Sequence, residues 1–282
     1  MANHGVVAII GPGLIGGSIG LGLRANGIAE RTIGVTRSDA STKRALTAGV
    51  VDVATTDLGA ACAEADLIVV CTPVSGVPAA CQQAAAAARP GTVITDGGST
   101  KKRLVEAVEQ ALDGSPVRFV GSHPLAGDHK SGPESARADL LAGRVVVVTP
   151  TRHTDADALE VVKRLWAGLG ARVESMSPAE HDAALAKTSH APHVIAAALA
   201  AATPEELLGL TGGGWRDTTR VAAGGAGLWR DILLDNPQAT LQALEAFTEQ
   251  LGRLQQAIAD NDRDATYRHL EEGKLRRDAL GS

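Results

Sequence analysis

The chain has 282 residues, a net charge of -5 at pH 7, 44% hydrophobic residues and 2% aromatic residues. This length suffices for two domains with substantial cores, whereas the shortage of aromatic and clustered basic side chains argues against nucleic-acid binding and a membrane-surface role. The three cysteines show no CxxC spacing, so neither a disulfide framework nor a zinc site is indicated, and a reducing cytoplasm is the expected compartment. No apolar run is long enough for a membrane span.

A glycine-rich turn follows the first predicted strand. Residues 6–10 form a β-branched run typical of a strand buried in a parallel sheet, and residues 11–16 then open a helical pattern. Gly11 would make the turn, Gly13 would let the backbone approach a pyrophosphate, and Gly16 would let helix and strand pack closely. This context predicts that a dinucleotide binds at Gly11, Gly13, Leu14, Ile15 and Gly16.

The second predicted strand, residues 32–35, should end beside the ribose of the adenosine. An NAD site would place Asp or Glu there, but this chain has Thr36, Arg37 and Ser38. A guanidinium and two hydroxyls suit a 2′-phosphate, so we expect NADP as the preferred cofactor, with NAD as the other choice. In the alternative interpretation Arg37 is a solvated charge and Asp39 reaches the ribose.

Two more strands, residues 66–71 and 91–96, end in small or polar residues at the same edge of the sheet. Thr72 and Pro73 follow the first and are candidates for cofactor binding. Ser99 follows the second and is a candidate polar group near the nicotinamide. Its alternative role is to N-cap a helix over residues 101–112, as serine often does.

The segment Gly-Ser-His-Pro-Leu-Ala-Gly, residues 121–127, follows a short predicted strand. We expect His123 to stand on a loop at the carboxyl end of that strand, where ligands bind in open α/β sheets. Pro124 biases His123 away from helical dihedrals, so the loop would hold one imidazole still. The alternative is a turn whose histidine only bonds to backbone. A polar loop over 128–133 is placed to cover a site.

Further strands at 144–149 and 171–174, around a helix at 155–168, complete an α/β domain. Ser177 as N-cap, Pro at the next position and Glu180 mark a strong helix start. We therefore predict a Rossmann-type, doubly wound dinucleotide-binding domain over 1–176 and an all-helical domain for substrate binding and dimerisation over 177–282.

The helix from Pro178 carries the polar residues of the second domain. His190 and His193 lie three apart and share a face, but no third ligand is suggested nearby, so a metal is not expected. Pro192 would kink the helix and turn that face toward the cleft. Alternatively, the two histidines are satisfied inside the helical bundle.

Two arginines and an apolar seam complete the second domain. Arg216 and Arg220 lie four apart; one could clamp a carboxylate bidentately, while the other pairs with Asp217 or Asp231. Apolar residues at alternating spacings of three and four then form a helix-packing seam, within the chain or between two chains: Leu244, Phe247, Leu251, Leu254 and Ile258. A homodimer is the preferred interpretation.

These motifs together resemble the prephenate and arogenate dehydrogenases of tyrosine biosynthesis along nearly the whole chain. The resemblance is carried by residues 11–16, 96–101 (Asp-Gly-Gly-Ser-Thr-Lys), 121–127, 189–193 (Ser-His-Ala-Pro-His) and 214–220 (Gly-Trp-Arg-Asp-Thr-Thr-Arg). It implies a nucleotide-binding domain, a dimerising helical domain and an active site between them. The implied reaction is the oxidative decarboxylation of prephenate or arogenate with hydride transfer to NAD(P), which gives 4-hydroxyphenylpyruvate or tyrosine.

The resemblance also implies residue roles. His123 would take the proton of the ring hydroxyl, and Ser99 would bond the same hydroxyl and orient His123. Arg220 would bind a substrate carboxylate with His193 nearby, and we count His190 and Lys187, on the helix of His193, with the substrate-binding residues. Many members have Glu where this chain has His129, so a gating or specificity role for that side chain is not carried over to this sequence. We expect no appended regulatory domain, so feedback inhibition by tyrosine would use the active site.

Two other functions fit parts of the pattern. β-Hydroxyacid dehydrogenases share the architecture and use a helix lysine as base, a part that Lys187 could play. A non-catalytic NADP-sensing dimer would need the fold and the glycines but not Ser99, His123 and Arg220 together. Fold alone excludes neither function.

Overall fold

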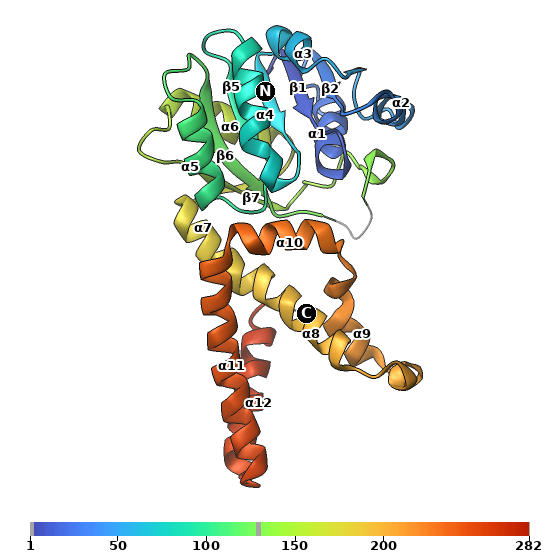
Figure 1. Cartoon of the computed structure of the whole chain (residues 1–282), viewed down its shortest axis with the longest axis vertical. Coiled ribbons are helices and arrows are strands. Elements are labelled where there is room, and N and C mark those ends of the chain that lie inside the picture. The colour runs from blue at the N-terminus through green and yellow to red at the C-terminus, as the bar shows by residue number, and fades with distance from the viewer. Residues whose placement is uncertain (1–2, 128–130, 282) are drawn as a thin grey trace.

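The computed structural model describes residues 3–127 and 131–281. A sheet flanked by helices occupies one end of the molecule, and helices alone build the other (Figure 1). In the described residues the strands are β1 (Val6–Ile10), β2 (Arg31–Val35), β3 (Val53–Thr55), β4 (Leu67–Val70), β5 (Val93–Asp96), β6 (Arg118–Pro124), β7 (Val145–Thr149) and β8 (Arg172–Ser175).

Helices of the sheet-containing part connect successive strands. They are α1 (Leu14–Ala25), α2 (Asp39–Thr47), α3 (Leu58–Glu64), α4 (Val77–Ala87), α5 (Lys102–Ala111) and α6 (Ala156–Gly168), with short 3₁₀ turns η1 (Val74–Gly76) and η2 (Pro133–Ser135). The strands follow the order β3-β2-β1-β4-β5-β6-β7-β8, in which only the β6–β7 pair is antiparallel. The first six strands thus have the order of a doubly wound nucleotide-binding sheet, whose ligands bind where the order reverses, between β1 and β4. The predicted fold class is confirmed.

Apolar cores cover both faces of this sheet. On one face Ile19 and Leu23 of α1 pack with Trp166 of α6, and all three are fully buried. On the other face Cys81 of α4 packs with Leu104 and Val108 of α5. The central strands are apolar at nearly every position because they are covered on both sides.

The helical part starts as the sequence predicts. Ser177 caps α7 (Pro178–Leu185) and shares a capping box with Glu180. The helix does not end at Pro192 but widens into a π-turn, η3 (Ala186–His190), before continuing as α8 (Ala191–Ala202). Pro192 has no N–H to donate one turn back, and such a bulge is one way a helix absorbs that loss.

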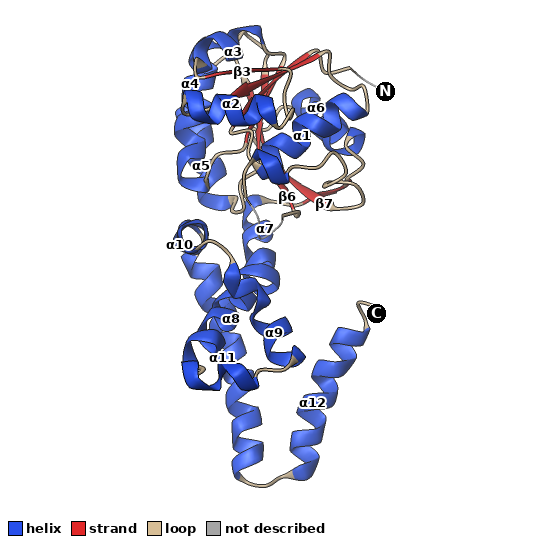
Figure 2. Cartoon of the chain, turned by 90° about the vertical axis from the view of Figure 1, so that its right-hand side faces the viewer, coloured by secondary structure: helices blue, strands red, loops and turns tan. Residues whose placement is uncertain are grey.

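The remaining elements are η4 (Glu205–Leu210), α9 (Gly213–Thr219), η5 (Arg220–Ala223), α10 (Ala226–Asp235), α11 (Pro237–Ala259) and α12 (Arg263–Asp278). Of these, α9 and η5 pack along α8, and α11 and α12 extend away from the sheet-containing part (Figure 2). Figure 2 shows α11 and α12 diverging from their connecting turn. No residue of α12 is buried, and Phe247, Leu251 and Ile258 of the predicted seam are 38%, 42% and 62% exposed. Within one chain the seam therefore stays largely open.

The structure differs from the sequence analysis in three local features. β6 continues to Pro124, so His123 lies in a strand rather than on a loop, because antiparallel pairing with β7 places it opposite Val147. β3 is a strand that the sequence analysis did not predict. Ser99 does not cap the following helix, whose N-cap is Lys101. No helix among residues 3–127 and 131–281 is long and apolar enough to cross a membrane.

Candidate active site

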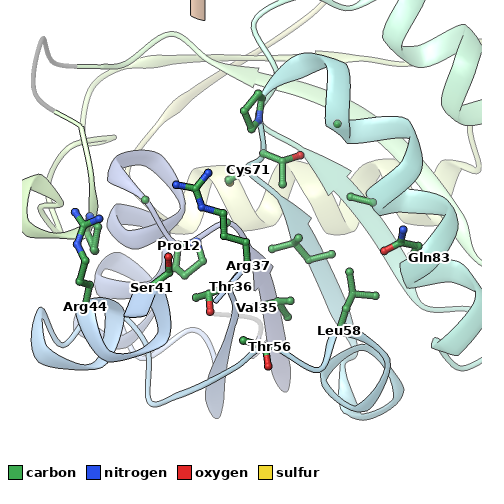
Figure 3. A pocket seen from close by; sticks show the side chains of 18 of the residues that line it. Pro12, Val35, Thr36, Arg37, Ser41, Arg44, Thr56, Leu58, Cys71 and Gln83 are labelled. Carbon is green, nitrogen blue, oxygen red and sulfur yellow. The ribbon is translucent and has the colours of Figure 1, made fainter. Parts of the chain in front are cut away.

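A cavity of about 570 Å³ opens at the point where the strand order reverses (Figure 3). It is lined by residues from the β1, β2 and β4 ends and by α2, α4 and the loop before η2. Of the predicted cofactor residues, the lining includes Gly11, Gly13, Thr36, Arg37, Thr72 and Pro73. Gly132 and Pro133, from the predicted covering loop, close one side of it. Asp128 and His129 lie outside the described residues.

The glycines of the first turn have the geometry expected of a phosphate cradle. Gly11 has a φ of +87°, and a Cβ on Gly16 would lie 2.4 Å from the Gly11 carbonyl oxygen, so neither tolerates a side chain. A Cβ on Gly13 would meet nothing within 4 Å. Helix α1 has no side-chain cap and no acidic residue in its first turn. The N-terminus is thus open to an anion, as a pyrophosphate requires.

Polar groups on the cavity wall also fit a dinucleotide. The Thr72 hydroxyl is buried and has no hydrogen-bond partner among the described residues. Arg37 extends into the middle of the cavity, and Ser41 and Arg44 of α2 add to its lining (Figure 3). Arg44 forms a bidentate pair with Glu134, with both N–O distances at 2.7 Å. Arg37 is therefore the lining guanidinium without a carboxylate partner in the described part of the chain.

The predicted cofactor residue Ser38 and its alternative Asp39 do not line the cavity. Ser38 caps α2, since its hydroxyl accepts from the Ser41 amide at 3.3 Å. Asp39 is exposed in the first turn of α2 and does not line the cavity, which disfavours the alternative in which it reads the ribose. Leu14, Ile15 and Gly16 lie in the first turn of α1 and do not line the cavity.

Three side chains that do not line the cavity form a hydrogen-bonded series that joins β6 to α7. His123 Nδ1 is 2.8 Å from Nε2 of His181, and His181 Nδ1 is 2.8 Å from Oδ1 of Asp182. His123 comes from β6, whereas His181 and Asp182 come from α7 in the helical part. The carboxylate of Asp182 also accepts the amides of Lys101 and Lys102, at 2.8 and 2.9 Å. These contacts fasten the helical part to the sheet beside His123.

Burial and hydrogen bonding determine the charge states of His123, His181 and Asp182. Burial lowers the pKa of His123 well below 6.5, and the neighbouring His181 and Lys101 lower it further. Burial also lowers the pKa of His181, although the Asp182 carboxylate opposes that effect. Burial alone would raise the pKa of Asp182, but hydrogen bonds from His181 and from two amides outweigh it, so the pKa of this carboxyl is lowered. At neutral pH both imidazoles are uncharged and the carboxylate is ionised.

These charges assign the tautomers. An ionised carboxylate only accepts hydrogen bonds, so the proton of His181 is on Nδ1 and its Nε2 is an acceptor. His123 must then donate from Nδ1. Its Nε2 is therefore unprotonated, which is the form that a general base needs.

Ser99 and the histidine pair on α7–α8 have different surroundings from those expected. No hydrogen bond joins Ser99 to His123 in the described residues; His181 orients the imidazole instead. His190 is satisfied inside the bundle, with Nδ1 3.3 Å from Asn236 Nδ2, which supports the structural alternative for this residue. His193 stacks on Trp229, with ring centroids 3.6 Å apart, and its buried Nδ1 has no partner in the described part of the chain.

The other predicted substrate residues lie on the surface of the helical part. Arg220 is exposed at the start of η5, which packs against α8, and Lys187 is exposed on the π-turn. Asp231 pairs with Arg230 at 2.7 Å and not with Arg216 or Arg220. Within residues 3–127 and 131–281, no group of three or more His, Cys, Asp and Glu side chains could hold a metal ion.

The sequence analysis missed the residues that hold His123. His181 is 58 residues from His123 in the sequence, and Asp182 accepts a hydrogen bond from the Lys101 amide, in the sheet-containing part. No spacing pattern within a short segment therefore identifies either residue. The signal present was their position in the first turn after a strong capping box. Lys101 belongs to the motif at residues 96–101, but the sequence does not predict its complete burial.

Comparisons with known proteins identify the relatives of this chain. A model described as "Prephenate dehydrogenase, nucleotide-binding domain" matches residues 19–175, and one described as "Prephenate dehydrogenase, dimerization domain" matches 177–272. A cyclohexadienyl dehydrogenase from Zymomonas mobilis is 36% identical over 97% of this chain and 95% of its own.

Solved structures give the same picture. Prephenate dehydrogenase from Aquifex aeolicus, in complex with hydroxyphenyl propionate and NAD⁺, has a TM-score of 0.90, with 33% identity over 99% of this chain and 98% of that one. Arogenate dehydrogenase from Synechocystis has a TM-score of 0.83, with 29% identity over 98% and 99% of the two chains.

Proposed function

This chain belongs to the prephenate dehydrogenase family, and we propose that it oxidises and decarboxylates prephenate, arogenate or both. The observation that carries the proposal is the hydrogen-bonded relay from His123 through His181 to Asp182, which leaves Nε2 of His123 unprotonated, in the same domain as the dinucleotide cavity. The products are 4-hydroxyphenylpyruvate from prephenate and tyrosine from arogenate.

The reaction needs a base for one proton. Nε2 of His123 accepts the proton of the ring hydroxyl as the carbinol hydrogen leaves with two electrons. General-base assistance of this kind contributes about 100- to 10,000-fold to the rate. The imidazolium that forms is stabilised by the Asp182 carboxylate, which it reaches through His181. The ring carboxylate then leaves as CO₂, and the electrons of its C–C bond complete the aromatic ring.

A nicotinamide cofactor, when bound, accepts the hydride. The N-terminus of α1 and the Gly11–Gly13 turn would hold its pyrophosphate, and the Thr72 hydroxyl, which has no partner among the described residues, also lines the cavity. His193 and Arg220 are proposed to bind substrate carboxylates. Nδ1 of His193, which has no partner within residues 3–127 and 131–281, supports that role, and the stack on Trp229 fixes its ring. Ser99, on the loop after β5, is proposed to bond the ring hydroxyl.

The base chemistry favours His123 over Lys187. The side chain of Lys187 is exposed, whereas His123 is tied to a buried partner that sets its tautomer. The β-hydroxyacid dehydrogenase interpretation is therefore not favoured, and a non-catalytic sensor would have no use for the relay. Product analysis by mass spectrometry, with each substrate and each cofactor in turn, tests the function. Absence of both aromatic products with cofactor still bound would contradict it.

We further propose that NADP is preferred to NAD. Support comes from Arg37, which lines the cavity without a carboxylate partner among the described residues. A charge-assisted hydrogen bond is worth about 1.5–3 kcal/mol, or about 10- to 150-fold in affinity. Replacing Arg37 by Gln should weaken 2′,5′-ADP binding by this factor in calorimetry and leave 5′-AMP binding nearly unchanged. Equal losses for the two probes would contradict the preference.

We propose that the active species is a homodimer formed through α11 and α12. The apolar seam of α11 is open in a single chain, and α12 also exposes Leu270 and Leu275, each by 60%. A second copy supplies a matching apolar face. Sedimentation velocity of the native protein should give a dimer, and Leu251→Lys should shift it toward monomer. A monomeric native protein would contradict the proposal.

A further inference from the structure

A buried ion pair lies beneath the site and takes no part in the proposed chemistry. Asp96 ends β5 and Lys101 precedes α5, and the side chains of both residues are 0% exposed. Lys101 Nζ donates to the Asp96 carboxylate and, at 2.8 Å, to the carbonyl oxygen of Ser122. A fully buried lysine is rare and needs a partner to be tolerated.

The ion pair connects the two segments that carry the reacting groups. Asp96 accepts the amide of Gly98 at 2.8 Å and the amide of Ser122 at 3.0 Å. The loop from Gly97 to Thr100, which includes Ser99, is thus held at both ends by the pair. Both members of the ion pair also bond to the backbone of Ser122, which directly precedes His123 in β6.

Lys101 also connects this pair to the histidine relay. Its side chain bonds to β5 and β6, while its amide donates to Asp182 at 2.8 Å. Asp182 in turn bonds to His181, the partner of His123. One residue therefore links the Ser99 loop, the His123 strand and the relay on α7.

We propose that Asp96 and Lys101 are positioning residues for the base, and that their ion pair fixes the position of the Ser99 loop relative to His123. The proposal rests on the proposed function only for the identity of the reacting groups. Stability alone does not explain such a pair, because a buried ion pair can commonly be replaced by apolar residues at little cost. Its contacts instead fix the relative positions of two loops, which reactions of this kind require.

The ammonium of Lys101 also acts on His123 by its charge. The charged and titratable groups around His123 are His181 and Asp182 on α7, His190 on the π-turn, Asp96 on β5 and Lys101 itself. After burial and His181, Lys101 is the next cause that lowers the pKa of His123. Loss of this ammonium removes a like charge that opposes the imidazolium, so the pKa of His123 rises.

Lys101→Met tests both parts of the proposal, and Lys102→Met is its matched control. The amides of both lysines bind Asp182, but the Lys102 side chain is exposed. Lys101→Met should lower kcat by about 10- to 100-fold, because misplacement of a reacting group by about 1 Å can cost that much. The KM for substrate and the KM for cofactor should change little. The acid limb of its pH profile should move up by about one pH unit, the lower end of the effect of a nearby charge. Lys101→Arg should restore the pH profile, and Lys102→Met should match the wild type.

Two further measurements keep the proposal open to refutation. The titration of His123, followed by NMR of ¹⁵N-labelled imidazoles, needs no substrate and so separates failure of this proposal from failure of the proposed function. If Lys101→Met does not fold, the double variant Asp96→Asn/Lys101→Met removes both charges and leaves none unpaired; it should show the same fall in kcat. A folded variant with the wild-type kcat, pH profile and His123 titration overturns the proposal.

Discussion

The hydrogen bond from His123 to His181 gives the sharpest test of the relay. His181→Leu removes the acceptor at 2.8 Å and leaves the Nδ1–H of the half-buried His123 facing an apolar side chain, at a position where His181 itself is fully buried. An unsatisfied buried donor costs about 1–3 kcal/mol, so the reactive tautomer becomes less populated. Converted at 1.36 kcal/mol per tenfold, the expected fall in kcat is about 5- to 150-fold.

The control for this change is His181→Gln, whose side-chain oxygen can accept from His123 while its NH₂ group donates to Asp182. We expect this variant to recover most of kcat. The assay is the absorbance of reduced nicotinamide at saturating substrate, with circular dichroism to confirm the fold. KM for the cofactor should not change, because His181 does not line the cavity. Wild-type kcat in a folded His181→Leu variant would refute the reasoning.

Other predictions follow from the cavity, the buried histidines and the stacked pair. Because the pKa of His123 is lowered, kcat/KM measured against pH should stay on its plateau as the pH falls through 6.5; a limb centred at 6.5 would contradict this. Gly16→Ala should lower Tm by several degrees, since its Cβ would clash at 2.4 Å with backbone and overpacking costs about 1–3 kcal/mol. Gly13→Ala should leave Tm unchanged and weaken cofactor binding in calorimetry. A larger fall in Tm for Gly13→Ala than for Gly16→Ala would contradict this account of the glycine turn. Trp229→Ala should raise KM for substrate by about 2- to 10-fold, because the stack of His193 on Trp229 is worth about 0.5–1.5 kcal/mol. An unchanged KM would show that Trp229 does not position His193 for substrate binding.

The parts of the fold that could be predicted depend on local chemistry. The strand before Gly11 and the helix after it follow from a β-branched run and from Gly11 and Gly16, which sit where a Cβ would clash. The start of α7 follows from the Ser177–Glu180 capping box. The resemblance to the prephenate dehydrogenases, based on five such short motifs, is confirmed by the family models.

The parts that could not be predicted depend on contacts between distant segments. β6 extends past Val120 because β7 pairs with it, and nothing within residues 117–124 encodes that partner. The short β3 exists because Val53 pairs with Ile33 of β2. The burial of Lys101 likewise depends on Asp96 and Ser122 converging from two strands, which a linear reading of the motif does not show.

His190 and His193 illustrate the same limit within one helix. Their spacing predicts a shared face, and both do contact Trp229. Their chemistry differs because Asn236 and Thr240 of the adjoining helix satisfy His190, while Nδ1 of His193 has no partner in the described part of the chain. Which of two equivalent histidines is free for a ligand is decided by tertiary contacts.

The most direct test of the central claim is turnover at 340 nm by the wild type and by His123→Asn, with prephenate and arogenate crossed against NAD and NADP. We predict turnover by the wild type in at least one combination. In His123→Asn it should fall by about 100-fold or more, the lower end of what a general base contributes, while cofactor affinity is retained. Turnover by the variant at the wild-type rate, or none by a wild-type protein that binds cofactor, would contradict the account.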